Sequence, residues 1–147
     1  KDESETLNFG SNIAALIKES NDSIFEFHLQ GNLGAGKTTL VRGVLRALGW
    51  RGSVKSPTYT ICEEYDFEEF LILHIDLYRT EIEEDVEMLE LNRDFNGKKV
   101  IFIEWPEKVE GKRMANLKIN MMHYQNSRKI EMIGDTILIE KLMKEDK

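Results

Sequence analysis

The sequence predicts an α/β fold: a single domain over residues 1–147, with a mixed, mostly parallel sheet flanked by helices. Short apolar runs typical of buried strands alternate with amphipathic helical stretches, which favours parallel strand pairs joined through helices. The strand-like runs outnumber what a purely parallel sheet would use, so we expect a mixed sheet. The chain has 147 residues, 41% of them hydrophobic, which suffices for one compact core and not for two.

The first half of the chain is predicted to form a helix, a strand, a loop and a second helix. Residues 6–18 carry apolar side chains at helical spacing and predict the opening helix. The apolar run 24–29 predicts a strand that stops at Gly31. Residues 38–48 again place apolar side chains at helical spacing and predict the second helix.

Strand-like runs dominate the second half of the chain. Polar or glycine-containing breaks separate these runs, including a turn expected at residues 125–127. The strands are predicted at residues 59–65, 71–76, 100–104, 117–124 and 129–133, and two more helices at residues 82–91 and 136–143.

A glycine-rich motif joins the first predicted strand to the second helix. Residues 31–38 fit the pattern G-x-x-x-x-G-K-[ST], with the strand before and the helix after that this motif requires. Its glycines let the backbone turn with N–H groups facing inward, so that amides and the helix N-terminus can surround a β-phosphate. Lys37 is then expected to bridge the β- and γ-phosphates, and Thr38 to place a hydroxyl beside Mg²⁺. The motif predicts a P-loop NTPase-like domain that binds ATP and Mg²⁺.

Two points about this loop stay open. A second hydroxyl, on Thr39, either contacts the α-phosphate or faces the sheet. The whole motif has the alternative of a glycine-rich turn that fits by accident, against which the flanking strand and helix argue. The residues predicted to bind phosphate are Asn32, Leu33, Gly34, Ala35, Gly36, Lys37, Thr38 and Thr39.

Two carboxylates stand at the ends of apolar strands. Asp76 closes the run 71–76 and Glu104 closes the run 100–104. Because the carboxyl ends of parallel strands meet at one edge of a sheet, we expect both beside the phosphate loop. Thr38, Asp76 and Glu104 are therefore the predicted Mg²⁺ ligands, and Lys37 joins the two acids as the catalytic set. The alternatives are that Asp76 caps the next segment and that Glu104 is a solvated strand terminus.

Hydroxyl side chains follow the second helix around a proline. In that position they could sense Mg²⁺ and the γ-phosphate, as a mobile switch loop does. A proline turn leading into a strand is the alternative. The predicted switch residues are Ser56, Pro57, Thr58, Tyr59 and Thr60.

Other side chains near these motifs have plainer interpretations. His74 lies inside an apolar strand, so we expect a satisfied core or edge histidine rather than a catalytic one. Trp105 follows Glu104 and is either a packed aromatic corner or a lid over the nucleotide. Cys62 is the single cysteine and is expected to be a half-buried apolar residue in a reducing compartment.

The composition excludes several classes of function. The net charge of -7 disfavours autonomous binding to RNA or DNA, although a phosphate site built from amides and one lysine is unaffected. No apolar run approaches the ~20 residues of a membrane span, and we expect a cytoplasmic protein with no membrane contact. A small-molecule kinase would need an arginine-rich lid, and a GTP switch protein would usually carry Asn-Lys-x-Asp, neither of which occurs.

Four sequence blocks, in this order and spacing, resemble the TsaE (YjeE) family. They are residues 31–39, 54–60, 74–79 and 104–107, and the resemblance extends from about residue 7 to residue 128. It implies a cytoplasmic P-loop ATPase of bacterial N6-threonylcarbamoyladenosine (t6A) synthesis at position 37 of tRNAs that read ANN codons. It also implies partners, TsaD and TsaB, with which the ATPase supports multiple turnover, and only indirect contact with tRNA.

The resemblance also assigns roles to matching residues. Lys37 and its loop correspond to the phosphate site, Thr38 and Glu104 to the Mg²⁺ positions, and Asp76 to the second acid. The predicted switch residues correspond to a first switch, and residues 104–106, which include Trp105, to a second. Arg128 stands where the family often has a nucleotide-proximal Gly-Arg, with Ser127 in place of the glycine. No family motif follows Gly134.

Overall fold

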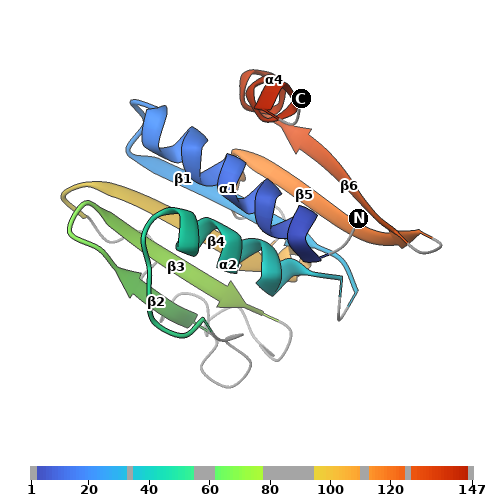
Figure 1. Cartoon of the computed structure of the whole chain (residues 1–147), viewed down its shortest axis with the longest axis horizontal. Helices are drawn as coiled ribbons and strands as arrows, with labels where there is room; N and C mark the ends of the chain where they lie inside the picture. Colours follow the sequence, from blue (N-terminus) through green and yellow to red (C-terminus); the bar gives the residue numbers. More distant parts are fainter. Residues whose placement is uncertain are drawn as a thin grey trace.

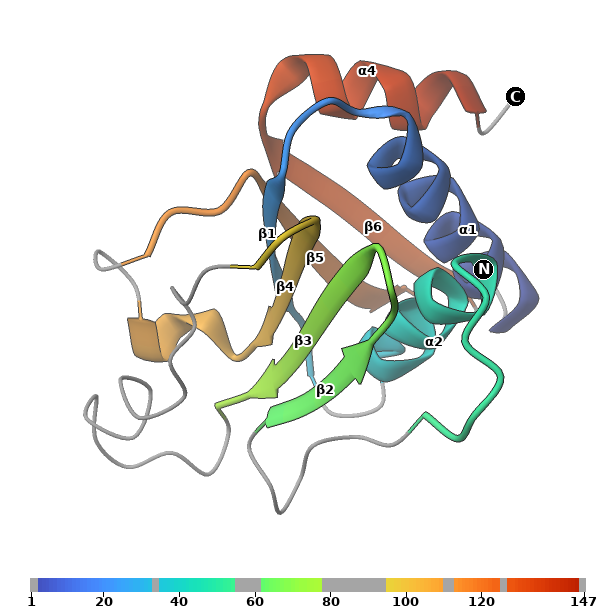
Figure 2. The same cartoon turned by 90° about the vertical axis from the view of Figure 1, so that its left-hand side faces the viewer.

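The computed structural model describes residues 3–32, 35–54, 62–77, 95–109, 113–124 and 127–145. These residues form one six-stranded sheet with helices packed against one of its faces (Figures 1 and 2). The predicted switch residues 56–60 and the predicted helix 82–91 lie outside the described residues.

The described helices and strands follow the predicted order. They are α1 (Glu3–Glu19), β1 (Ile24–Gln30), α2 (Lys37–Ala47), β2 (Cys62–Asp66), β3 (Phe70–Asp76), β4 (Lys98–Glu104), the short 3₁₀ helix η1 (Pro106–Val109), β5 (Leu117–Tyr124), β6 (Ser127–Gly134) and α4 (Thr136–Glu145).

Several boundaries and one element differ from the sequence predictions. The opening helix begins at Glu3, three residues earlier than predicted. Ser127 belongs to β6 and not to the turn, because it pairs with Tyr124 at the end of the antiparallel ladder. The 3₁₀ helix η1 was not predicted, since four residues are too few to show a periodicity.

The sheet is mixed and mostly parallel, as predicted. Its strand order is β2-β3-β4-β1-β5-β6. The four central strands run parallel, and β2 and β6 pair antiparallel at the two edges. β1 therefore lies between β4 and β5, and the carboxyl ends of all three strands open onto the loop that leads into α2.

Apolar side chains cover both faces of the central strands. On the helix side, the ring of Phe27 stacks between Phe25 at 6.2 Å and Phe102 at 5.2 Å between centroids. A smaller cluster on the opposite face consists of Leu71, Leu73, Ile75, Leu77, Ile101 and Ile103. Burial on both faces explains why these strands read as continuous apolar runs rather than as alternating ones.

Helices α1 and α2 lie side by side over the sheet (Figure 1) and approach each other through two glycines. A Cβ atom on Gly10 would lie 2.6 Å from the carbonyl oxygen of Leu40, and one on Gly43 would lie 2.5 Å from that of Leu7. No side chain fits at either point. Because α2 begins directly after the glycine-rich loop, this close packing fixes the position of the loop.

Candidate functional site

The glycine-rich loop leaves β1 and enters α2 through backbone conformations that require glycine. Gly31 has φ 151° and Gly36 has φ 105°, and a Cβ on Gly31 would lie 2.5 Å from the carbonyl oxygen of Met121. Gly36 is the N-cap of α2 and offers no side-chain acceptor, and no acidic residue occupies the first turn. The first amides of α2 therefore keep their capacity to bind an anion.

Lys37 places its ammonium group within this loop. Lys37 is 5% exposed, and its Nζ donates to the carbonyl oxygen of Gly31 at 2.5 Å. The same atom lies 4.0 Å from Oε1 of Glu104 and 4.4 Å from the ring centroid of Trp105. Burial lowers the pKa of Lys37 from its ordinary value, and the nearby carboxylates of Glu104, Asp76 and Glu107 offset part of that effect.

The two acidic candidates lie on neighbouring strand ends. Asp76 ends β3, Glu104 ends β4, and the two residues pair in register. Glu104 also pairs with Leu29 of β1, which brings it next to the loop. Glu104 is only 4% exposed, so its interpretation as a solvated strand terminus was wrong. The metal-binding role of both acids stays a prediction.

His74 contacts the buried acid directly. Its Nε2 lies 2.5 Å from Oε2 of Glu104, and its residue has no exposed surface. The sequence predicted a satisfied core or edge histidine, and the structure shows a core one. Nothing in the sequence indicated the contact with Glu104, because that contact depends on how β3 and β4 align.

Trp105 follows Glu104 in a left-handed conformation, with φ 60°. A non-glycine residue in this region is strained and is held there by its surroundings. η1 begins at the next residue, Pro106. The ring of Trp105 packs against the ammonium group of Lys37, so it is an aromatic wall of the loop.

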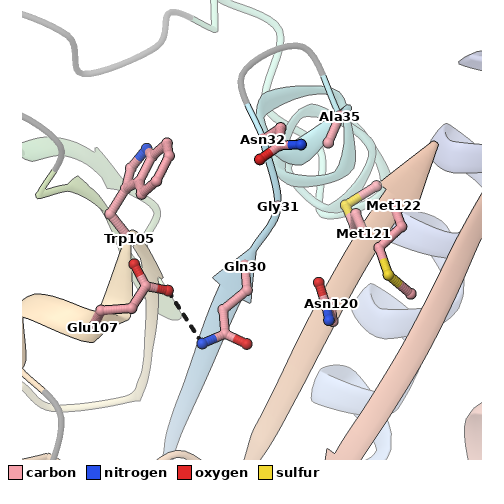
Figure 3. A pocket seen from close by; sticks show the side chains of 9 residues that line it. All are labelled: Gln30, Gly31, Asn32, Ala35, Trp105, Glu107, Asn120, Met121 and Met122. Atoms are coloured by element: carbon pink, nitrogen blue, oxygen red, sulfur yellow. Dashed lines mark hydrogen bonds between the residues drawn. The ribbon is translucent and has the colours of Figure 1, made fainter.

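A pocket of about 560 Å³ opens beside the loop (Figure 3). Gln30, at the end of β1, donates from Nε2 to Oε1 of Glu107 at 3.1 Å across one side of it. β5 supplies the other side because Asn120 pairs with Gln30. The lining residues are Gln30, Gly31, Asn32, Ala35, Trp105, Glu107, Asn120, Met121 and Met122. Sequence reasoning missed the β5 residues, since no local motif marks them.

The side chains at the loop fit a magnesium ion by their chemistry. Thr38 is the second residue of α2, and with Asp76 and Glu104 it offers hydroxyl and carboxylate oxygens, the hard ligands that Mg²⁺ prefers. Within the described ranges, no three His, Cys, Asp or Glu residues form a closed metal cage.

The structure brings part of the predicted site together. Gly36, Lys37, Asp76, Glu104 and Trp105 surround one point at the carboxyl edge of the sheet. Thr39 is half-buried on α2. The backbone of Arg128 lies in β6 opposite His123, and its role stays a prediction. Asn32 and Ala35 line the pocket, and Thr38 lies in the first turn of α2. The other predicted residues lie outside the described residues: Leu33, Gly34, Ser56, Pro57, Thr58, Tyr59 and Thr60.

Among the helices that the structure describes, none is long and apolar enough to cross a membrane.

Comparison with known proteins identifies the family. The family described as threonylcarbamoyl adenosine biosynthesis protein TsaE matches residues 1–130. A relative from Haemophilus influenzae, named tRNA threonylcarbamoyladenosine biosynthesis protein TsaE, is 42% identical over 139 residues, which cover 93% of this chain and 88% of the relative. A protein of the same name from Aquifex aeolicus is 36% identical over 108 residues, covering 72% and 73% of the two chains.

A solved structure agrees with these sequence relatives. The crystal structure of Bacillus subtilis YdiB superimposes with a TM-score of 0.76 at 26% sequence identity, covering 100% of this chain and 93% of that one. The two chains share the mixed α/β fold. This chain belongs to the TsaE family.

Proposed function

We propose that this protein binds ATP with Mg²⁺ and hydrolyses it to ADP and phosphate in the synthesis of t6A at position 37 of tRNA. The observation that carries the proposal is the position of Lys37, whose ammonium group lies in the glycine loop and faces Glu104 at 4.0 Å. A buried lysine, a helix N-terminus without a side-chain cap and adjacent carboxylates form a site suited to a polyphosphate and its metal ion.

Each group in the site has a defined part. The loop amides and Lys37 bind the β- and γ-phosphates. To do so, Lys37 gives up its hydrogen bond to the carbonyl oxygen of Gly31 and donates to phosphate oxygens instead. Thr38 and Glu104 hold Mg²⁺, with Asp76 as the second acid. The adjoining pocket of about 560 Å³ has room for the remainder of the nucleotide and offers the amides of Gln30 and Asn120 for polar contacts.

Hydrolysis by the isolated protein is expected to be slow. An arginine finger contributes about 10³-fold or more in P-loop enzymes. Three arginines placed by the structure are engaged elsewhere: Arg42 lies 3.5 Å from Glu3, Arg46 donates to the carbonyl of Trp50, and Arg113 pairs with Glu26. TsaD and TsaB are the proposed partners that complete the site, with tRNA contacted only indirectly.

The test is nucleotide hydrolysis by the purified protein, alone and with TsaD and TsaB. We expect ATP to yield free phosphate in a Mg²⁺-dependent reaction that the partners change, and GTP to bind more weakly. Phosphate transferred to a small acceptor would instead identify a kinase. Tighter binding of GTP than of ATP would identify a GTP-dependent switch protein.

A further inference from the structure

His74 and Glu104 form a buried hydrogen-bonded pair next to the phosphate loop. His74 pairs in register with Phe102, two residues before Glu104 on β4. The separation of 2.5 Å between Nε2 and Oε2 joins a histidine with no exposed surface to a carboxylate that is 4% exposed. A contact this well shielded from water holds both side chains in one orientation.

The other ring nitrogen shows which tautomer makes this bond. Nδ1 of His74 is buried and has no hydrogen-bond partner among the residues that the structure describes. An N–H group in that position would be an orphaned donor, which folded proteins avoid more strongly than an under-satisfied acceptor. The favoured tautomer carries its proton on Nε2, which donates to Glu104, and leaves the lone pair on Nδ1.

The two carboxylate oxygens of Glu104 have different neighbours. Oε2 of Glu104 accepts from His74, and Oε1 lies 4.0 Å from Nζ of Lys37, on the side of the phosphate loop. The backbone of Glu104 is fixed separately, because its carbonyl accepts from the N–H of Leu77 at 3.1 Å. The rotation of the carboxylate itself therefore depends on His74.

We infer that His74 is a positioning residue, whose Nε2–H orients the Glu104 carboxylate so that Oε1 faces the magnesium ion of the bound nucleotide. The inference rests on the proposed function, in which Glu104 holds Mg²⁺. Hydrogen-bonded partners of metal ligands act in this way, and their removal typically lowers metal affinity about 10-fold or more. His74 has no exposed surface, so in this inference it acts only through Glu104.

Two substitutions of matched shape test this role. Gln and Met are unbranched and similar in length, but only Gln carries an N–H donor at its end. ADP affinity is measured by calorimetry for His74→Gln and His74→Met, in EDTA and over a series of Mg²⁺ concentrations. We expect nearly unchanged affinity in EDTA for both. The Mg²⁺ concentration for half-maximal effect should rise about 10-fold in His74→Met and much less in His74→Gln.

The outcomes separate this inference from the proposed function. Glu104→Gln is measured beside the two variants. If Glu104→Gln raises the Mg²⁺ requirement and His74→Met does not, the positioning role is wrong and the nucleotide site stands. Equal losses in His74→Gln and His74→Met, with and without Mg²⁺, identify a packing residue only. If Glu104→Gln leaves the Mg²⁺ dependence unchanged, the metal assignment fails and the inference fails with it.

A measurement on the unsubstituted chain covers the case in which His74→Met does not fold. Carbon and nitrogen NMR shifts of the imidazole distinguish the two neutral tautomers, and the His74→Gln spectrum assigns the signal among the three histidines of the chain. We expect the Nε2–H tautomer for His74, with a proton shifted by the short hydrogen bond. An Nδ1–H tautomer would overturn the inference.

Discussion

Lys37 is a buried lysine at the end of the glycine-rich loop. Its ammonium group contacts the carbonyl of Gly31, and Glu104 lies 4.0 Å away. Burial lowers its pKa, which means that the surroundings do not fully replace the water it has lost. A bound phosphate would supply the charge-assisted hydrogen bonds that this site lacks.

Lys37→Ala should therefore abolish tight nucleotide binding and leave the fold intact. Hydrogen bonds to charged groups contribute about 1.5–3 kcal/mol each, so the loss of two predicts a fall in ATP affinity of about 100-fold or more. Lys118→Ala is the matched control, because Lys118 is exposed on β5. Calorimetric titration measures both variants. Unchanged ATP affinity in a folded Lys37→Ala protein would remove the phosphate site.

Trp105 should report on nucleotide binding by its fluorescence. Its ring centroid lies 4.4 Å from Nζ of Lys37, so movement of the lysine toward phosphate changes the environment of the ring. Trp50 is a natural control, because it packs edge-on against Tyr65 at 5.1 Å and Phe67 at 5.6 Å. We expect Trp105→Phe to abolish the nucleotide-induced change and Trp50→Phe to retain it. The reverse pattern would place the second switch elsewhere.

The secondary-structure elements that carry the site are held in place by contacts outside the site itself. α2 packs closely against α1. β1 is linked to the segment before β5 by contacts of Glu26. That side chain accepts from Arg113 at 2.6 Å and lies 2.6 Å from Nε2 of His28. The backbone N–H of Glu26 also donates to Oδ1 of Asn116 at 2.7 Å. These contacts lie on the opposite face of the sheet from α2.

Gly43→Ala should destabilise the protein by about 1–3 kcal/mol, the usual cost of extra volume in a packed interface. The added Cβ would lie 2.5 Å from the carbonyl oxygen of Leu7. A backbone atom cannot relieve this clash by a change of rotamer. Ser11→Ala on the exposed side of α1 is the control, with an expected change below about 0.5 kcal/mol. Urea unfolding gives both values. A Gly43→Ala protein as stable as the parent would contradict the close helix contact.

The Glu26 cluster predicts a pH dependence of stability. Burial alone would raise the pKa of Glu26, but hydrogen bonds and attraction from His28 and Arg113 outweigh it and leave the pKa below its ordinary value. A carboxyl with a lowered folded pKa stabilises the fold above its unfolded pKa, and this contribution is lost as pH falls through the folded pKa.

Glu26→Gln removes this titration. Its destabilisation relative to the parent should be largest at pH 7 and should shrink toward acid pH, where the parent has lost the same contribution. Urea unfolding at several pH values measures the difference, with the exposed Glu131→Gln as control. A constant difference at every pH would show that the charge of Glu26 is not the source of its effect.

At the scale of the whole molecule, local patterns and long-range alignment contributed differently to what was predictable. The strand, loop and helix around Lys37 follow from residues close together in sequence. The shared edge of Asp76 and Glu104 follows from the rule for parallel strands. The bond from His74 to Glu104 and the pocket wall at Asn120 do not, because they depend on which strands are neighbours and in what register. Periodicity within one strand contains no information about its neighbours.

A substitution at Glu104 should affect both ATP hydrolysis and the proposed modification reaction with partner proteins. Glu104→Gln keeps the shape of the side chain and an oxygen that can accept from His74, but it removes the charge that is proposed to bind Mg²⁺. We expect this variant to fold, to bind nucleotide in EDTA, and to hydrolyse ATP at least about 10-fold more slowly. With TsaD, TsaB and tRNA it should then fail to support repeated rounds of t6A formation.

A multiple-turnover modification assay, run beside the ATPase measurement, tests this coupling. Glu131→Gln on the exposed face of β6 serves as the control and should behave like the parent. If hydrolysis is lost while the modification yield stays complete, ATP turnover does not drive the cycle. If the yield never depends on this protein, the role in t6A synthesis is wrong even though the nucleotide site stands. Parallel loss of both activities is the result that the arrangement of Lys37, Asp76 and Glu104 predicts, because the three residues lie together at the proposed phosphate and metal site.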